Sequence, residues 1–163
     1  MKELEKVLDY KFKNIDYLKI GLTHSSYANE HKKLHIKCNE RQEFLGDAVL
    51  SIVVSDYIYK HCPSLPEGDL TKLRAALVCE KSLAGYARSI NLGDYLLLSK
   101  GERHSNGQER PSFLADAFES VIAAIYLDGG MEEARKFVLR FVIPDIKSAK
   151  PIRFKDYKTQ LQE

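Results

Sequence analysis

The segment Asn39-Glu40-Arg41-Gln42-Glu43-Phe44-Leu45-Gly46-Asp47-Ala48-Val49-Leu50 decides the fold predicted for this chain. It belongs to a predicted helix that runs from about Cys38 to about His61. At about 100° of rotation per residue, Glu40, Glu43 and Asp47 share one narrow stripe of that helix. The opposite side is expected to face a core, because it carries the aliphatic residues Leu45, Val49, Ile52 and Val53.

The acidic stripe is not typical of a purely solvated helix face. Leu50 and Val54 continue it, and Phe44 lies at its edge. Most acidic stripes face water, but a partly buried carboxylate is costly unless it is paired or binds a metal. The pattern therefore favours a site over surface decoration.

A second predicted helix, from Pro111 or Ser112 to Gly129-Gly130, repeats the pattern. Asp116 and Glu119 share a stripe that Ala123 and Leu127 continue. The other side forms the predicted core face, with Leu114, Phe118, Val121 and Ile125. Two such stripes could face each other and form a nest of four carboxylates. Oxygen ligands without cysteine or several histidines favour Mg²⁺ or Mn²⁺ over zinc, and such ions can promote phosphodiester hydrolysis.

Length and composition indicate one globular domain, because 163 residues with 44% hydrophobic content are ordinary for a folded protein. The net charge of +2 does not by itself indicate a nucleic-acid partner. Three cysteines, Cys38, Cys62 and Cys79, form no CxxC pair, so a reducing, cytoplasmic compartment is expected. The start lacks a signal-peptide core, and the longest apolar run, Val121 to Leu127, is too short to span a bilayer. No membrane association is predicted.

The remaining sequence predicts further helices joined by polar connections. The polar loop at 28–37 is locally basic, which alone is more typical of a solvated loop than of an RNA-binding patch. The run 94–98 is compatible with a helical turn or a strand, and 100–111 is expected to be a mobile loop. The other predicted helices span residues 2–8, a segment capped by Asn14 or Asp16, 67–78, 80–91 and 131–149, the last kinked or divided at Pro144.

Several motifs resemble those of one known family. Glu40–Leu50 closely resembles the signature of the ribonuclease III family, metal-dependent endonucleases that cut double-stranded RNA. Leu114–Tyr126 resembles the family's other acidic motif, and Leu22–Tyr27 and Pro66–Ala75 resemble two more. Gln42 departs from the signature, because the family more often carries leucine or another aliphatic residue there. Gln42 lies away from the acidic stripe, so the departure puts little of the chemistry in doubt.

The resemblance covers about residues 5–163 and implies an all-α, dimeric ribonuclease III fold. Residues 1–149 would form the catalytic domain and 150–155 a basic linker. Residues 156–163 resemble the opening of the double-stranded RNA-binding domain that follows in bacterial ribonuclease III, so the chain is expected to stop inside that domain. The implied activity is hydrolysis of double-stranded RNA to 5′-phosphate and 3′-hydroxyl ends, in rRNA and mRNA processing.

Matched position by position, the resemblance implies that Glu43, Asp116 and Glu119 bind the metal. It gives Asp47 and Glu119 the most direct catalytic roles. The implied cofactor is Mg²⁺, with Mn²⁺ as a substitute. Every acid that can be matched is retained.

The resemblance makes Glu40 and Glu67 supporting acids, although Glu67 could equally be a helix-dipole acid. Phe44 is the expected contact of a homodimer that pairs through the signature helices. His24, in the Leu22–Tyr27 motif, is expected to be a hydrogen-bonded structural histidine.

Two other functions stay open. A catalytically silent RNA-binding scaffold of the same fold would be expected to have lost acids, which this chain has not. In a generic helical interaction module the acidic stripes would be surface accidents. That alternative predicts that Asp47→Asn and Glu119→Gln change no activity.

Overall fold

The computed structural model describes the backbone of residues 1–160 and the side chains of residues 1–148. This part of the chain is built from helices, so the predicted all-α fold class is confirmed. The α-helices are α1 (Lys2–Leu8), α2 (Asp16–Gly21), α3 (Ser25–Glu30), α4 (Glu40–His61), α5 (Glu67–Val78), α6 (Glu80–Ser89), α7 (Lys100–His104), α8 (Pro111–Gly129) and α9 (Met131–Gln160). Short 3-10 helices are η1 (Lys32–Leu34), η2 (Leu92–Tyr95) and η3 (Gly107–Glu109).

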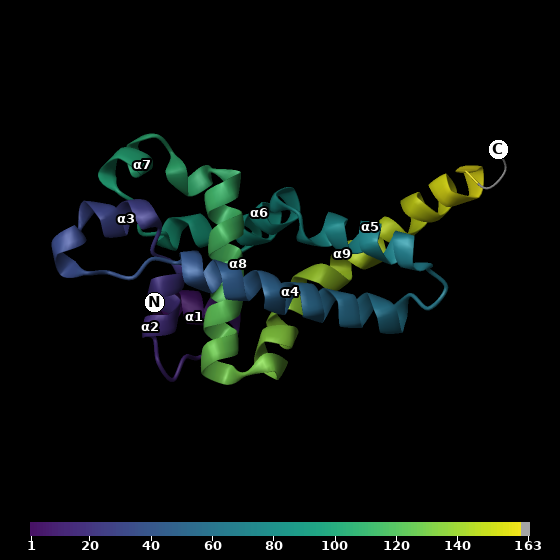
Figure 1. The fold of residues 1–163 in the computed structure, drawn as a ribbon, viewed down its shortest axis with the longest axis horizontal. Helices are drawn as coiled ribbons and strands as arrows, with labels where there is room; N and C mark the ends of the chain where they lie inside the picture. The colour runs from purple at the N-terminus through teal and green to yellow at the C-terminus, as the bar shows by residue number, and fades with distance from the viewer. Residues whose placement is uncertain (161–163) are drawn as a thin grey trace.

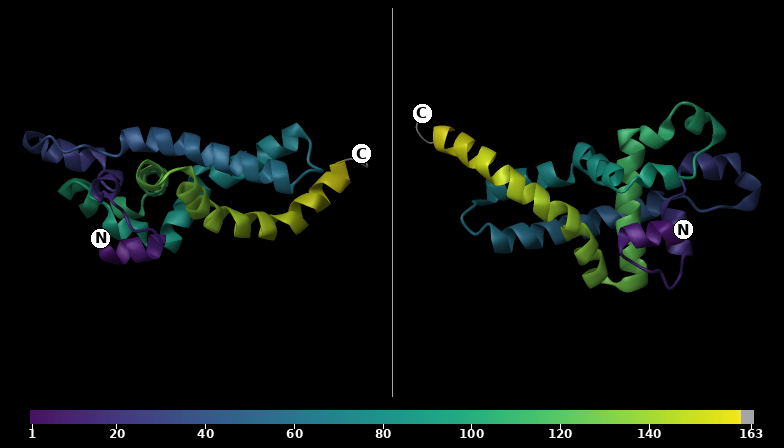
Figure 2. Two further views of the ribbon diagram at one scale, coloured as in Figure 1. Left: turned by 90° about the horizontal axis from the view of Figure 1, so that it is seen from below. Right: turned by 180° about the vertical axis from the view of Figure 1, so that it is seen from behind.

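Helix α8 lies at the centre of the molecule (Figures 1 and 2). It begins with Pro111 at its first position and ends at Gly129, and the capping residue that follows, Gly130, has a φ of +88° that glycine readily adopts. Most of the α8 surface is apolar, as expected for a buried helix, and Asp116 and Glu119 interrupt it on one stripe. Helices α2, α4, α6 and α9 all pack on it. Its fully buried residues include Ala117, Val121, Ile122, Ala123, Ala124 and Ile125.

Helix α4 crosses α8 and also packs against α5 and α9. Val49 and Val53 are buried on the predicted core face, and Leu50 and Val54, which continue the acidic stripe, are completely buried. The prediction for Ile52 was wrong, because its side chain is 54% exposed. Burial on both the core side and the acidic side of α4 leaves the face with Ile52 uncovered.

The two predicted loops contain short helices, which corrects the sequence analysis. In place of an irregular loop at 28–37, α3 reaches Glu30 and η1 follows it. The His24 ring accepts a hydrogen bond from the Ser26 N–H at 3.1 Å and so caps α3, in keeping with its predicted structural role. Ser99 likewise caps α7, because its hydroxyl accepts a hydrogen bond from the Glu102 N–H at 3.2 Å.

The run 94–98 combines both of its predicted possibilities. Its first residues belong to η2, and Leu97 then forms an isolated parallel bridge with Thr23. The Leu97 N–H donates to the Leu22 carbonyl at 2.9 Å, and the His24 N–H donates to the Leu97 carbonyl at 3.0 Å. These bonds attach the segment before α7 to the segment before α3.

Helix α9 is not divided at Pro144 but continues through it, and Figure 2 shows that it is curved. Its backbone stays helical through 150–155, where the sequence analysis expects a linker. The assignment of 156–163 to a second domain stays a prediction, and residues 161–163 lie outside the described part of the chain. Within residues 1–160, every helix is too short or too polar to span a bilayer.

Candidate active site

The two acidic helices touch at Gly46. A Cβ atom added to Gly46 would lie 1.8 Å from the backbone carbonyl oxygen of Glu119, which no side chain can tolerate. The backbones of α4 and α8 are therefore in direct contact, and only glycine fits on the α4 side. Gly46 directly precedes Asp47 and follows Glu43 by about one turn, so the contact brings these acids beside Asp116 and Glu119.

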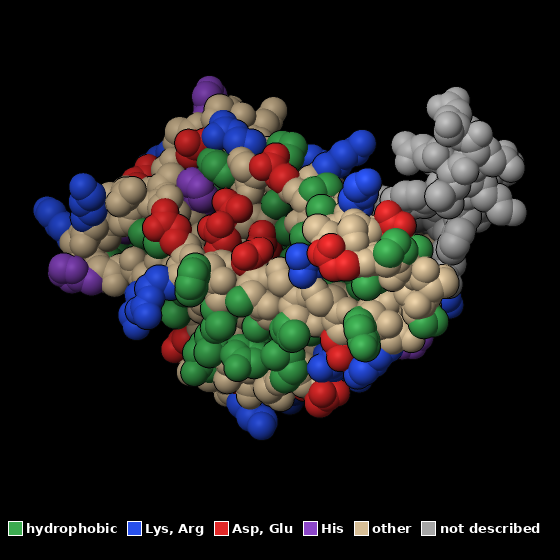
Figure 3. Space-filling view, turned by 45° about the vertical axis from the view of Figure 1, so that its right-hand side comes forward, with side chains coloured by type: hydrophobic (Ala, Val, Ile, Leu, Met, Phe, Trp, Pro, Cys, Tyr) green, Lys and Arg blue, Asp and Glu red, His purple; other side chains and the backbone are tan. Residues whose placement is uncertain are grey.

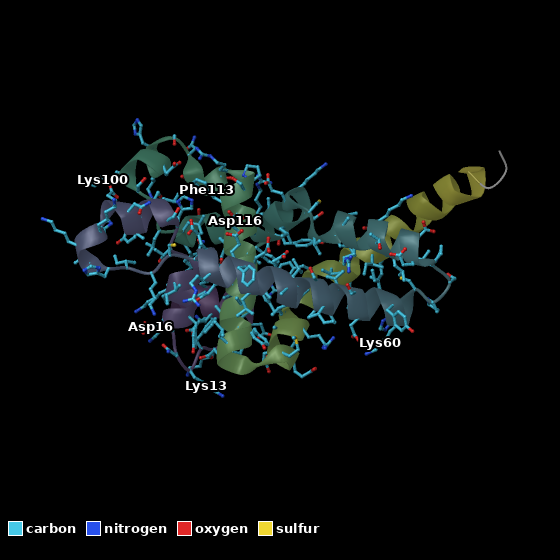
Figure 4. All side chains as sticks on the ribbon, in the orientation of Figure 1. Lys13, Asp16, Lys60, Lys100, Phe113 and Asp116 are labelled. Carbon is cyan, nitrogen blue, oxygen red and sulfur yellow. The ribbon has the colours of Figure 1, made fainter. Side chains whose placement is uncertain are left out.

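Four carboxylates gather at this crossing. Figure 4 shows Asp116 on α8 beside the point where α4 passes, and Figure 3 shows acidic side chains in one band on this face. Glu43, Asp116 and Glu119 are half-buried, whereas Asp47 is exposed. The nest predicted from the two helical stripes is therefore present in the fold.

Glu119 is the most perturbed of these acids. Burial is the main cause that raises its pKa from 4.5 to about 8, and the negative charges of Asp47, Glu43 and Asp116 add to it. A hydrogen bond with Asp47 further favours the protonated form of Glu119. Without a cation, Glu119 therefore holds a proton near neutral pH.

The other two half-buried acids are shifted in the same direction. Burial raises the pKa of Glu43, with the charges of Asp116, Glu40 and Asp47 adding to the effect. Burial also raises the pKa of Asp116, and here the neighbouring charge is Glu80, the first residue of α6. Glu80 was not predicted from the sequence to belong to the site. Its one signal was an acid at a helix start, which the helix dipole alone explains.

The supporting acids differ in their placement. Glu40 is exposed at the start of α4 and lies close enough to Glu43 to raise its pKa. Glu67 is exposed at the start of α5 and accepts a hydrogen bond from the Thr71 hydroxyl at 2.9 Å. Glu67 is not among the groups that raise the pKa of Glu43, Asp116 or Glu119. The structure thus joins Glu40 to the nest but gives Glu67 no coupling to it.

His24 lies at the edge of the site. Its ring packs in a tilted arrangement against that of Phe113, one turn before Asp116, with 4.0 Å between ring centroids. The Arg110 guanidinium lies 4.5 Å from the centroid of the same Phe113 ring. Burial lowers the pKa of His24, although Glu102 and Glu40 act against this shift. These contacts brace the first turn of α8, and Asp116 follows in the next turn.

The donor set fits a hard divalent cation. Carboxylate oxygens are the preferred ligands of Mg²⁺, and a double positive charge would favour the ionised forms that burial and neighbouring charges oppose in these three acids. Among the side chains that the structure describes, no three His, Cys, Asp or Glu residues already stand in an arrangement that encloses an ion. Binding would therefore require the acidic side chains to rotate inward.

Comparisons with known proteins identify the family of this chain. A family model described as Ribonuclease-III-like matches residues 14–146. Ribonuclease 3 of Listeria monocytogenes is 48% identical over 161 residues, which are 99% of this chain and 70% of the relative. Ribonuclease 3 of Oceanobacillus iheyensis is 47% identical over 163 residues, which are 100% of this chain and 72% of the relative.

Two solved structures of the nuclease domain of ribonuclease III from Campylobacter jejuni have the same fold. One aligns with a TM-score of 0.81 at 46% identity and covers 89% of this chain and 95% of its own. The other, described as showing flexibility in a region involved in dimer formation, aligns with a TM-score of 0.81 at 47% identity over 86% and 94%. Together with the acids gathered at the crossing, these similarities show that the chain belongs to the ribonuclease III family of enzymes.

Proposed function

We propose that this chain is a Mg²⁺-dependent endoribonuclease that hydrolyses phosphodiester bonds of double-stranded RNA to 5′-phosphate and 3′-hydroxyl ends. The observation that carries the proposal is the raised pKa of three half-buried acids from two crossing helices. Such groups are a poor choice for a merely structural helix contact, since their burial opposes ionisation. Mn²⁺ is the expected substitute ion.

Glu43, Asp116 and Glu119 would hold the ion. When bound, Mg²⁺ supplies activation of water and neutralises negative charge on the phosphate. Glu119 must first release the proton that its raised pKa retains near neutral pH. Asp47 is exposed and within hydrogen-bonding reach of Glu119, so it is placed to accept a proton at the solvent side of the site.

We further propose a homodimer that forms through α4. Phe44 is 82% exposed, Ile52 is 54% exposed and Tyr59 is 73% exposed, and the spacing places all three on one face of the helix. Exposed apolar surface of this kind marks interaction sites. The Campylobacter nuclease domain is described as having a region involved in dimer formation. A two-fold dimer would offer one active centre to each strand of a duplex.

The proposed setting is the cytoplasm, with precursors of rRNA and mRNA as substrates. The free cysteines Cys38, Cys62 and Cys79 fit a reducing compartment. The alternative, a catalytically silent RNA-binding scaffold, would have no use for four acids at one crossing. It predicts duplex binding without metal-stimulated cutting.

Cleavage of a labelled RNA duplex tests the proposal. Wild-type protein with Mg²⁺ should make staggered cuts, and EDTA or the variant Glu119→Gln should abolish them. Glu132→Gln is the matched control, because Glu132 is an exposed acid on α9 whose carboxylate is paired with Arg135. Cutting that persists in EDTA, or in Glu119→Gln, would contradict the proposed mechanism.

A further inference from the structure

Beneath the acids, two buried polar side chains connect α4 to α8. Gln42 is only 7% exposed, and its Nε2 donates to the backbone carbonyl of Tyr17 at 3.0 Å and to that of Ser120 at 3.2 Å. Ser120 is completely buried. Its hydroxyl lies 2.8 Å from the Asp116 carbonyl and 3.1 Å from the Asn39 carbonyl, so its single proton can be donated to either.

The surrounding backbone leaves space for this network. A Cβ atom added to Gly21 of α2 would lie 3.2 Å from Gln42 Nε2 and 3.3 Å from the Ser120 carbonyl oxygen. The Asn39 side chain donates to the Gly21 carbonyl at 3.3 Å, which holds the start of α4 against the end of α2. The amide at position 42 therefore occupies a tight, polar cradle formed by three helices.

An aliphatic residue at position 42, which the family more often carries, could donate none of these hydrogen bonds. Gln42 directly precedes Glu43, and Ser120 directly follows Glu119. The hydrogen bond from the Gln42 side chain to the Ser120 backbone carbonyl therefore links α4 to α8 within one residue of the acids. The network opposes any sliding or rotation of α4 along α8 that would let the repelling carboxylates separate.

We propose that Gln42 is a positioning residue, which together with Ser120 fixes the register of α4 against α8 and thereby the convergence of Glu43 and Glu119 on a divalent cation. This inference rests on the proposed function, because it requires that these acids hold the ion. Gln42 is buried, and its amide is bonded to backbone carbonyls, so its effect on the ion runs through the helix register.

The test uses Gln42→Met, which retains side-chain length and helix propensity but removes the amide. Mn²⁺ binding to the RNA-free protein is followed by the EPR signal of the free ion, and duplex cleavage is measured against Mg²⁺ concentration. One buried hydrogen bond corresponds to roughly a fivefold change in an equilibrium constant. We expect Mn²⁺ affinity to fall and half-saturating Mg²⁺ to rise by about that factor, with kcat recovered at saturating Mg²⁺.

Gln108→Met is the matched control. Gln108 is a half-buried glutamine in η3 whose side chain donates a hydrogen bond to Asn106 Oδ1 at 3.4 Å. It should leave Mn²⁺ affinity unchanged. Should Gln42→Met fail to fold, Gln42→Asn provides a second variant, since it keeps the polarity but is too short to reach both carbonyls, and the same shift is expected.

A merely structural role would lower Tm and the active fraction but leave Mn²⁺ affinity unchanged, and that result would overturn the inference. The combination with Glu119→Gln adds a second criterion: the effect of Gln42→Met on Mn²⁺ affinity should shrink to less than about twofold, since one converging acid is then neutral. A persisting fivefold effect would also overturn it.

If wild-type protein binds and uses the ion but Gln42→Met matches it, this inference fails alone. If wild-type protein neither binds Mn²⁺ nor cleaves, the proposed function fails with it.

Discussion

Glu119→Gln should stabilise the metal-free protein at pH 8 while it abolishes cleavage. The pKa of Glu119 is raised from 4.5 to about 8 in the fold, so folding opposes its ionisation. Below pH 4.5 the Glu119 carboxyl is protonated in both the folded and the unfolded state, so its raised pKa does not change the free energy of unfolding. As pH rises towards 8, the unfolded chain ionises more readily than the folded one, and stability is lost. A neutral glutamine escapes this loss and can still donate a hydrogen bond to Asp47.

The size of the effect follows from the shift. At about 1.4 kcal/mol per pKa unit, the full shift corresponds to roughly 4–5 kcal/mol at pH 8. Glu119 is only half-buried, and solvent screening should reduce this to about 2 kcal/mol. At pH 5 the raised pKa of Glu119 lowers the stability of the wild type by only about 0.5 kcal/mol or less. For a domain of this size, about 2 kcal/mol raises Tm by roughly 4–8 °C.

The assay is thermal and urea denaturation of wild type and variant in EDTA at pH 5 and pH 8. Both proteins are compared at one protein concentration, because the stability of a dimer depends on concentration. Glu132→Gln serves as the control at both pH values and should match wild type. Adding Mg²⁺ at pH 8 should stabilise wild type more than Glu119→Gln. If Glu119→Gln is no more stable than wild type at pH 8, or if its gain in stability is equal at both pH values, the reasoning is refuted.

Three further predictions follow from the crossing and its surroundings. Gly46→Ala should destabilise the fold by about 3 kcal/mol in urea denaturation, since its Cβ would clash with the Glu119 carbonyl. Gly85→Ala is the control: its Cβ would lie in open space, so it should stabilise the helix by about 0.5–1 kcal/mol. Equal effects of the two substitutions would contradict the close backbone contact at Gly46. Phe44→Asp should weaken dimerisation by about 30-fold in analytical ultracentrifugation with little change in monomer stability, and an unchanged dimer would remove Phe44 from the interface. Glu80→Gln should lower the pKa of Asp116 in an NMR titration, because the Glu80 charge raises it; an unmoved titration would separate Glu80 from the site.

The long helices could be predicted from the sequence because local and tertiary signals agree there. Helix α5 spans Glu67–Val78 as predicted, and α8 spans Pro111–Gly129 between a proline and a glycine pair. Short helices α3 and α7 were missed, since a single capping hydrogen bond within polar sequence leaves no apolar periodicity to detect.

The acids of the site could be predicted, but not the contacts that position them. Helical rotation placed Glu43 and Asp47 on one stripe, whereas it could not show that Gly46 meets the backbone of the other acidic helix. Ile52 was assigned to the core because a helical wheel assumes one buried face, and α4 has two. Rotation alone also set Gln42 aside as remote from the acids, although it hydrogen-bonds to the residue beside Glu119.

The arrangement at the crossing explains why polar groups are retained inside an otherwise apolar junction. Direct backbone contact at Gly46 brings four carboxylates together, and the raised pKa values of Glu43, Asp116 and Glu119 reflect burial and neighbouring charges that oppose ionisation of these three acids. An apolar junction would be more stable, but it would have no affinity for a cation. Helices that met only through apolar side chains could also relax apart under the repulsion. The hydrogen bonds of Gln42 and Ser120 have defined directions, so they favour a single register, and that register holds the acids close enough for one ion to relieve their repulsion.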